Sequence, residues 1–183
     1  MTNSVKMVKN NKAIVTKIYI PKFILALSKL AVNFFKMMIS FGIVIVLMIV
    51  SRVPVSINLL YIPLLFIELM ILVYGLMCIL LHFGVYVNDL SNVVRIGLKM
   101  MFYLTGVFYS IEGKLGKSYE TLSYLLSVFN PIAFIMTSLR NCMLYSQGIN
   151  LKVYLIWFAI SIGIGCLGTV LVYKNENSYV KVI

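Results

Sequence analysis

Few side chains in this chain are of types that perform chemistry, and their spacing builds no catalytic set. The 183 residues include one histidine, three cysteines and five acidic residues. Cys78, Cys142 and Cys166 are too far apart in sequence for a CxxC or zinc pattern, and we expect them to pack as small hydrophobic side chains. His82 has no nearby base, ligand or carboxylate in the sequence. The sequence therefore predicts no catalytic residue, no metal site and no cofactor on this chain.

A GxGxxG string occurs at Gly163, Gly165 and Gly168. It lies inside an apolar run and follows no strand, so it lacks the context that dinucleotide binding requires. Small residues at Ser161, Gly165 and Gly168 instead predict a surface that another helix approaches closely within the membrane.

Glu68 is an acidic residue inside the otherwise apolar run of residues 59–81. An acid at hydrocarbon depth is costly and marks a cavity or a partner. One hypothesis is that Glu68 faces a translocation path. The alternative is a helix that begins later and leaves Glu68 near the outer interface, and the sequence favours neither.

The composition requires the bilayer as the main solvent of this chain. It is 62% hydrophobic and 11% charged, with a mean hydropathy of +1.01, whereas soluble domains are about a quarter charged. The net charge of +11 could indicate nucleic-acid binding. However, the basic residues flank the apolar runs, and the lysines before the first long run come without an acid. This pattern is typical of cytoplasmic ends under the positive-inside rule, so we expect membrane lipid and no nucleic acid as a partner.

The apolar runs predict an all-α integral membrane protein, in which residues 1–183 form one transmembrane domain. We expect about four transmembrane helices at 26–50, 59–81, 96–111 and 153–173, after a cytoplasmic segment at 1–25 that breaks at Pro21. Asn130-Pro131 interrupts the apolar stretch within 119–147, so we expect a pair of short re-entrant helices there, before the last span. Four crossings and the bias of basic residues predict that both termini are cytoplasmic.

Aromatic residues concentrate near the outer boundary of the third predicted span, at Phe102, Tyr103, Phe108 and Tyr109. The sequence favours an interfacial aromatic belt. A sugar-stacking surface is the alternative, because aromatic faces suit the apolar faces of pyranose rings.

Several motifs follow one another in a distinctive order: IVTKIYIPKFIL (14–25), two spans, GVYVNDLSNVV (84–94), FYLTGVFYSIEG (102–113), FNPIAF (129–134) and a final span. This order resembles the permease subunits of type-2 ABC exporters, in the branch that moves teichoic acids, O-antigens and capsular polysaccharides. The resemblance extends from about residue 11 to the C-terminus.

The resemblance implies a permease that performs no covalent chemistry in the cytoplasmic (inner) membrane. Two permeases, forming a homodimer, would line a path for a lipid-linked glycan or polyol-phosphate polymer. Two ABC ATPase subunits would dock on them and hold the ATP.

Site residues follow from the same resemblance. The segment similar to the ATPase-coupling helix comprises Lys17, Ile18, Tyr19, Ile20, Pro21 and Lys22, and Asn88-Asp89 resembles the Arg-Asp pair of the second cytoplasmic loop. Tyr103, Phe108 and Tyr109, next to Phe102, fall in the outer-gate aromatic stretch. Asn130, Pro131 and Arg140 match the re-entrant region. With Glu68, these residues are the predicted path and gate.

The chain also departs from the family pattern. Asn88 replaces the usual arginine, which removes the cation of a salt bridge there, and Gly106 stands where proline is common, which we expect to loosen the gate helix. The family has six spans, so we expect two spans to be missing before residue 1, through a truncated gene, a mis-assigned start or a split permease. A drug or peptide exporter permease and a truncated, non-transporting remnant are the alternative functions.

Overall fold

The computed structural model of this chain describes residues 1–11, 21–53, 56–87, 89–105 and 130–182. Within these ranges the backbone is helical, apart from short connections, and contains no strand, which confirms the all-α prediction. The helices are α1 (Thr2–Val5), α2 (Met7–Asn10), α4 (Lys22–Val50), the 3₁₀ helix η1 (Ile57–Tyr61), α5 (Ile62–Tyr86), α6 (Leu90–Leu104), α9 (Pro131–Leu144) and α10 (Leu151–Val182).

Among the described residues, three helical segments are long and apolar enough to cross a membrane: Lys22–Val50, Ile57–Tyr86 and Leu151–Glu176. α5 alone has 25 residues, which at 1.5 Å per residue span about 37 Å, more than the ~30 Å hydrocarbon core. These segments overlap three of the four predicted spans. α6 begins the fourth with 15 residues, and the end of the predicted range 96–111 lies outside the described residues.

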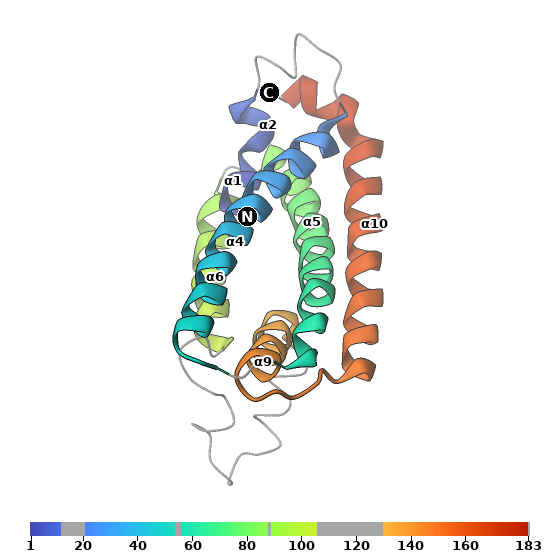
Figure 1. The fold of residues 1–183 in the computed structure, drawn as a ribbon. Helices are drawn as coiled ribbons and strands as arrows, with labels where there is room; N and C mark the ends of the chain where they lie inside the picture. Colours follow the sequence, from blue (N-terminus) through green and yellow to red (C-terminus); the bar gives the residue numbers. More distant parts are fainter. Residues whose placement is uncertain (12–20, 54–55, 88, 106–129, 183) are drawn as a thin grey trace.

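α5 and α10 run parallel, whereas α4 and α6 run the other way (Figure 1). The parallel arrangement is visible in two contacts, because the Tyr154 hydroxyl donates to the Leu64 carbonyl near the start of both helices and His82 meets Tyr179 near their ends. The N-terminal helices and the C-terminus therefore lie toward one end of the bundle, and α9 lies at the other (Figure 1).

α5 is the centre of the packing. One apolar cluster joins it to α2, α4 and α10 toward the termini, through buried residues that include Met7 and Val8 of α2, Leu81 of α5 and Tyr179 of α10. A second cluster joins α5, α9 and α10 at the opposite end, around Leu65, Phe134, Ile135 and Tyr154. α4 leaves most of its side chains exposed, which suits a helix whose solvent is hydrocarbon.

The first residues of the chain pack into the bundle. Ser4 and Val5 of α1 are buried, and the Val5 carbonyl occupies the place where a side chain at residue 84 would begin, so that only glycine fits there. α4 begins at Lys22 after Pro21, earlier than the predicted start at residue 26, and α10 continues past residue 173 to Val182. The polar C-terminal tail is thus helical as far as Val182.

Candidate functional site

Those of the predicted coupling residues that the structure describes lie toward the end of the bundle where the C-terminus lies (Figure 1). Pro21 has an extended backbone (ψ 124°) and precedes α4, whose first residue, Lys22, is buried. Asp89 is exposed and precedes α6, where its carbonyl accepts hydrogen bonds from the amides of Asn92 and Val93. The two segments that resemble ATPase-contacting elements thus enter α4 and α6 at the same end (Figure 1).

Some predicted site residues lie outside the described part of the chain. These are Lys17, Ile18, Tyr19, Ile20 and Asn88 of the coupling set, and Phe108 and Tyr109 of the gate set. Their roles stay predictions.

Asn130 and Pro131 begin α9 at the end of the bundle away from the termini. The Asn130 side-chain oxygen accepts from the amides of Ile132 (3.1 Å) and Ala133 (3.4 Å), and Pro131 occupies the first turn, where its missing N–H costs nothing. The Asn130 side-chain nitrogen donates to the Thr105 hydroxyl at 3.5 Å. The helix break predicted at Asn-Pro is therefore a capped helix start, and this cap also joins α9 to the end of α6.

Phe102 and Tyr103 lie in the last turn of α6. Their rings are edge to face, with the ring centroids 5.8 Å apart. Tyr103 is 71% exposed, whereas Phe102 is 44% exposed. Both line a cavity of about 420 Å³ that the N-terminal Thr2 and the basic side chains of Arg95 and Lys99 also line. Sequence reasoning missed that the N-terminus reaches these aromatic residues, because that contact depends on the packing of α1 against α6.

Glu68 lies in the second turn of α5 and is fully buried. Neither carboxylate oxygen has a hydrogen-bond partner among the described residues, and the buried Ser161 hydroxyl of α10 has none either. Leu65 and Leu72 share its face and are buried too. α5 begins at Ile62, so the carboxylate lies within the packed helices but in an early turn, and the alternative of a Glu68 near the outer interface stays open. Its place on a translocation path stays a prediction.

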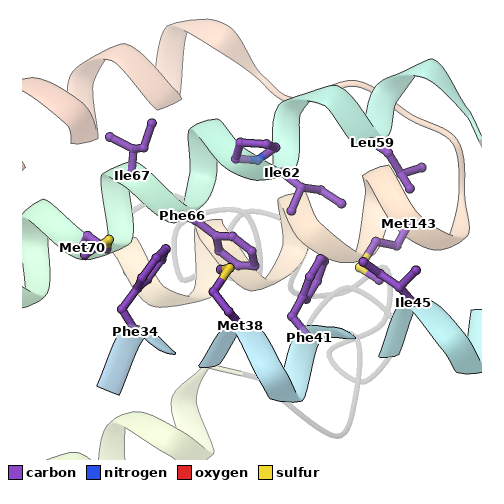
Figure 2. Close-up of a pocket in the computed structure, with 11 residues that line it drawn as sticks. Phe34, Met38, Phe41, Ile45, Leu59, Ile62, Phe66, Ile67, Met70 and Met143 are labelled. Carbon is purple, nitrogen blue, oxygen red and sulfur yellow. The ribbon is translucent and has the colours of Figure 1, made fainter. Parts of the chain in front are cut away.

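A groove lies between α4 and α5, and α9 closes one end of it (Figure 2). Its volume is about 440 Å³. Ile67 and Met70 of α5 line it, but their neighbour Glu68 does not. Arg140 lies on α9 and is half-buried, one turn before Met143, which lines the groove.

His82 has a partner that the sequence did not reveal. Its Nδ1 and the Tyr179 hydroxyl share a hydrogen bond of 2.6 Å, and the Tyr86 ring packs against both rings. Burial raises the pKa of the Tyr179 phenol, which therefore stays neutral. The bond joins the end of α5 to the last turns of α10, and no sequence signal identifies it because the two residues are far apart along the chain.

The fold and these sites define an α-helical membrane protein with a short capped helix at one end and its C-terminus at the other. The chain is similar to the O-antigen export system permease protein RfbA of Klebsiella pneumoniae, with 25% identity over 141 residues. The similar region is 76% of this chain and 52% of the relative, so the chain spans about half the length of the curated protein that it matches. This similarity confirms the resemblance to exporter permeases. No family model matches the chain, and no solved structure matches it significantly.

Proposed function

We propose that this chain is the membrane-spanning subunit of an ATP-driven exporter that moves a lipid-linked polysaccharide or teichoic acid across the cytoplasmic membrane. The observation that carries the proposal is the similarity to an O-antigen export permease over most of this chain. That relative's name favours a polysaccharide of the O-antigen kind as the substrate. The chain itself performs no covalent chemistry, and ATP is bound and hydrolysed on a separate ATPase subunit.

The arrangement of the helices supports this proposal. An exporter driven from one side of the membrane needs its ATPase-facing segments together, and Pro21–Lys22 and Asp89 lie at one end of the bundle. It also needs an entrance or exit at the other end, where Asn130 joins α9 to α6. Nucleotide-driven movement at the first end would reach the second through α4 and α6, which run the length between them.

Gene deletion in a host that makes the polymer tests the proposal. We expect the surface glycan to disappear and the lipid-linked polymer to accumulate inside, and the full chain supplied in trans should restore export. A deletion strain with normal surface glycan and no accumulated polymer would contradict the export function. Export of a drug or peptide in place of a glycan would appear as altered resistance or secretion in the same strain.

Docking of the ATPase is tested separately by co-purification in detergent. Asp89→Ala removes an exposed acidic side chain that makes no capping hydrogen bond, so we expect it to lower the amount of co-purified ATPase without unfolding α6. Asn92→Ala, also exposed and one turn further along, is the matched control and should leave the amount unchanged. Equal recovery of ATPase with both variants would exclude Asp89 from the contact.

A further inference from the structure

In the part of the chain that the structure describes, the groove between α4 and α5 is lined by apolar side chains alone (Figure 2). Phe41 and Phe66 meet across it edge to face, with ring centroids 4.9 Å apart. Methionines contribute flexible side chains that adapt to the shape of an occupant. The lining comprises Phe34, Met38, Phe41, Ile45, Leu59, Ile62, Pro63, Phe66, Ile67, Met70 and Met143.

The groove lies at hydrocarbon depth. Its α4 and α5 residues belong to two of the segments that are long and apolar enough to cross the bilayer. An empty groove of this size would leave its lining without dispersion contacts on one side. Inside a bilayer, the chemistry that fills such a space is a hydrocarbon chain.

Arg52 follows the end of α4, beyond the groove lining and toward the end of the bundle where α9 lies (Figure 1). Arg52 has a left-handed backbone (φ 52°), in a turn where the Val53 amide donates to the Met48 carbonyl and the Arg52 amide to the Ile49 carbonyl. Helices that end in this way usually place glycine at this position, because a side chain costs about 1–2 kcal/mol there. Glycine would adopt this backbone conformation at a lower cost in free energy than arginine does. The property that arginine adds at this position is its positive charge.

The surrounding charges favour an anion at this end. Lys152 at the start of α10 lies at the same end of the bundle as the end of α4, which Arg52 follows (Figure 1). In the part of the chain that the structure describes, Asp89 and Glu176 lie toward the opposite end, and Glu68 is buried within α5. An apolar groove with a basic end matches a hydrocarbon chain that carries a phosphate.

We propose that this groove binds an anionic phospholipid of the bilayer, with one acyl chain between α4 and α5 and the phosphate at Arg52. The site is separate from the proposed coupling segments, which lie at the other end of the bundle. It does not depend on export activity.

Quenching of tryptophan fluorescence by brominated lipids tests the proposal on the purified full chain in vesicles. Trp157→Phe removes the single native tryptophan, and Phe66→Trp places a reporter in the groove. Vesicles of phosphatidylcholine then receive increasing fractions of brominated phosphatidylglycerol or, separately, brominated phosphatidylcholine. We expect half-maximal quenching at a fraction of the anionic lipid that is about fivefold lower than the fraction of phosphatidylcholine. A basic residue near anionic lipid contributes ~1 kcal/mol, which corresponds to this preference.

The control reporter is Ile43→Trp. Ile43 lies in α4 outside the groove lining, and its side chain is 59% exposed. It should show no preference between the two lipids. Arg52→Gly should abolish the preference at the groove reporter while the helix end remains folded, because glycine adopts the left-handed conformation readily. Circular dichroism of each variant verifies helix content.

Equal quenching of the groove reporter by the two lipids would overturn the proposal. Absence of quenching at the groove, with normal quenching at residue 43, would also overturn it, because protein from a second copy or another segment would then fill the space. Neither result bears on export, since no ATPase or polymer is present.

Discussion

Glu68 is the residue at which the chain departs most from the usual rules of membrane packing. It is an acid with both carboxylate oxygens buried and without a hydrogen-bond partner among the described residues. An unpaired polar group in such a place costs about 1–3 kcal/mol, and an ionised carboxylate costs more. A residue present at that cost is a candidate for function, either through a proton or through a partner in the proposed exporter.

Replacement of Glu68 by leucine should stabilise the isolated chain. Leucine removes the unpaired carboxyl group and keeps an apolar side chain against Leu65 and Leu72, so we expect a higher midpoint of thermal unfolding in detergent, by an amount equivalent to about 1–3 kcal/mol. Circular dichroism during heating measures it. Ser161→Ala, which removes another buried and unpaired group, should shift the midpoint in the same direction.

Export measured in the deletion strain then separates structure from function. A Glu68→Leu chain that is more stable but inactive supports a role on the path. A less stable Glu68→Leu chain would show that the carboxylate has a stabilising partner outside the described residues.

At the scale of the elements, the α5–α10 pair is held by glycines that face each other. A Cβ atom added at Gly75 would lie 2.7 Å from the Gly165 amide nitrogen, and one at Gly168 would lie 2.7 Å from the Gly75 carbonyl oxygen. These distances bring the two backbones into direct contact, as small residues do in membrane helix pairs. The sequence prediction for Gly165 and Gly168 is confirmed, and the partner helix is α5.

Alanine at either contact glycine should destabilise the chain. Gly75→Ala and Gly168→Ala force the helices apart, because the obstructing atoms are backbone, and we expect a loss of about 1–3 kcal/mol, seen as a lower unfolding midpoint in detergent. Gly163→Ala is the matched control, since a Cβ there meets nothing within 4 Å. It should leave the midpoint unchanged or raise it, because alanine favours helix by about 0.5–1 kcal/mol. A fall with Gly163→Ala as large as with the other two would contradict the contact.

The Asn-Pro motif forms the cap at the start of α9. Asn-Pro in an apolar stretch predicts a break, and the break is a cap in which Asn130 bonds the first amides of α9 and reaches Thr105 of α6. The far end of α9 is joined as well, because the Asn58 side chain donates to the Ser146 carbonyl at 2.6 Å. Both ends of this short helix are therefore fixed to neighbouring segments.

At the scale of the whole molecule, the C-terminus lies at one end of the bundle, and α1 and α2 lead from the middle of the bundle toward that end (Figure 1). Lys22 and Lys29 near the start of α4 and Lys174 in the last turns of α10 lie toward that end, and the positive-inside rule favours the cytoplasm for it.

Short epitope tags on both termini should therefore be protected together. In right-side-out vesicles we expect neither tag to be digested by added protease, and both to be digested after detergent is added. Immunoblotting with the two tag antibodies measures this, and digestion of one tag alone in intact vesicles would contradict the shared orientation.

The sequence alone was sufficient for the class of protein and the position of its main spans. The free energy of transfer into hydrocarbon is a local property that adds up along a segment, so composition predicts spans at 26–50, 59–81 and 153–173. These ranges overlap the long apolar helical segments Lys22–Val50, Ile57–Tyr86 and Leu151–Glu176. The motif order further pointed to exporter permeases, as the similarity to RfbA confirms.

Only the tertiary structure decided which residues meet. α5 is apolar around most of its circumference, so no amphipathic pattern tells which face packs against α10 and which lines the groove. The burial of Glu68, the bond between His82 and Tyr179, and the packing of α1 against Gly84 all join residues from different helices. Such contacts depend on how whole helices approach one another, and no local stretch of sequence contains that information.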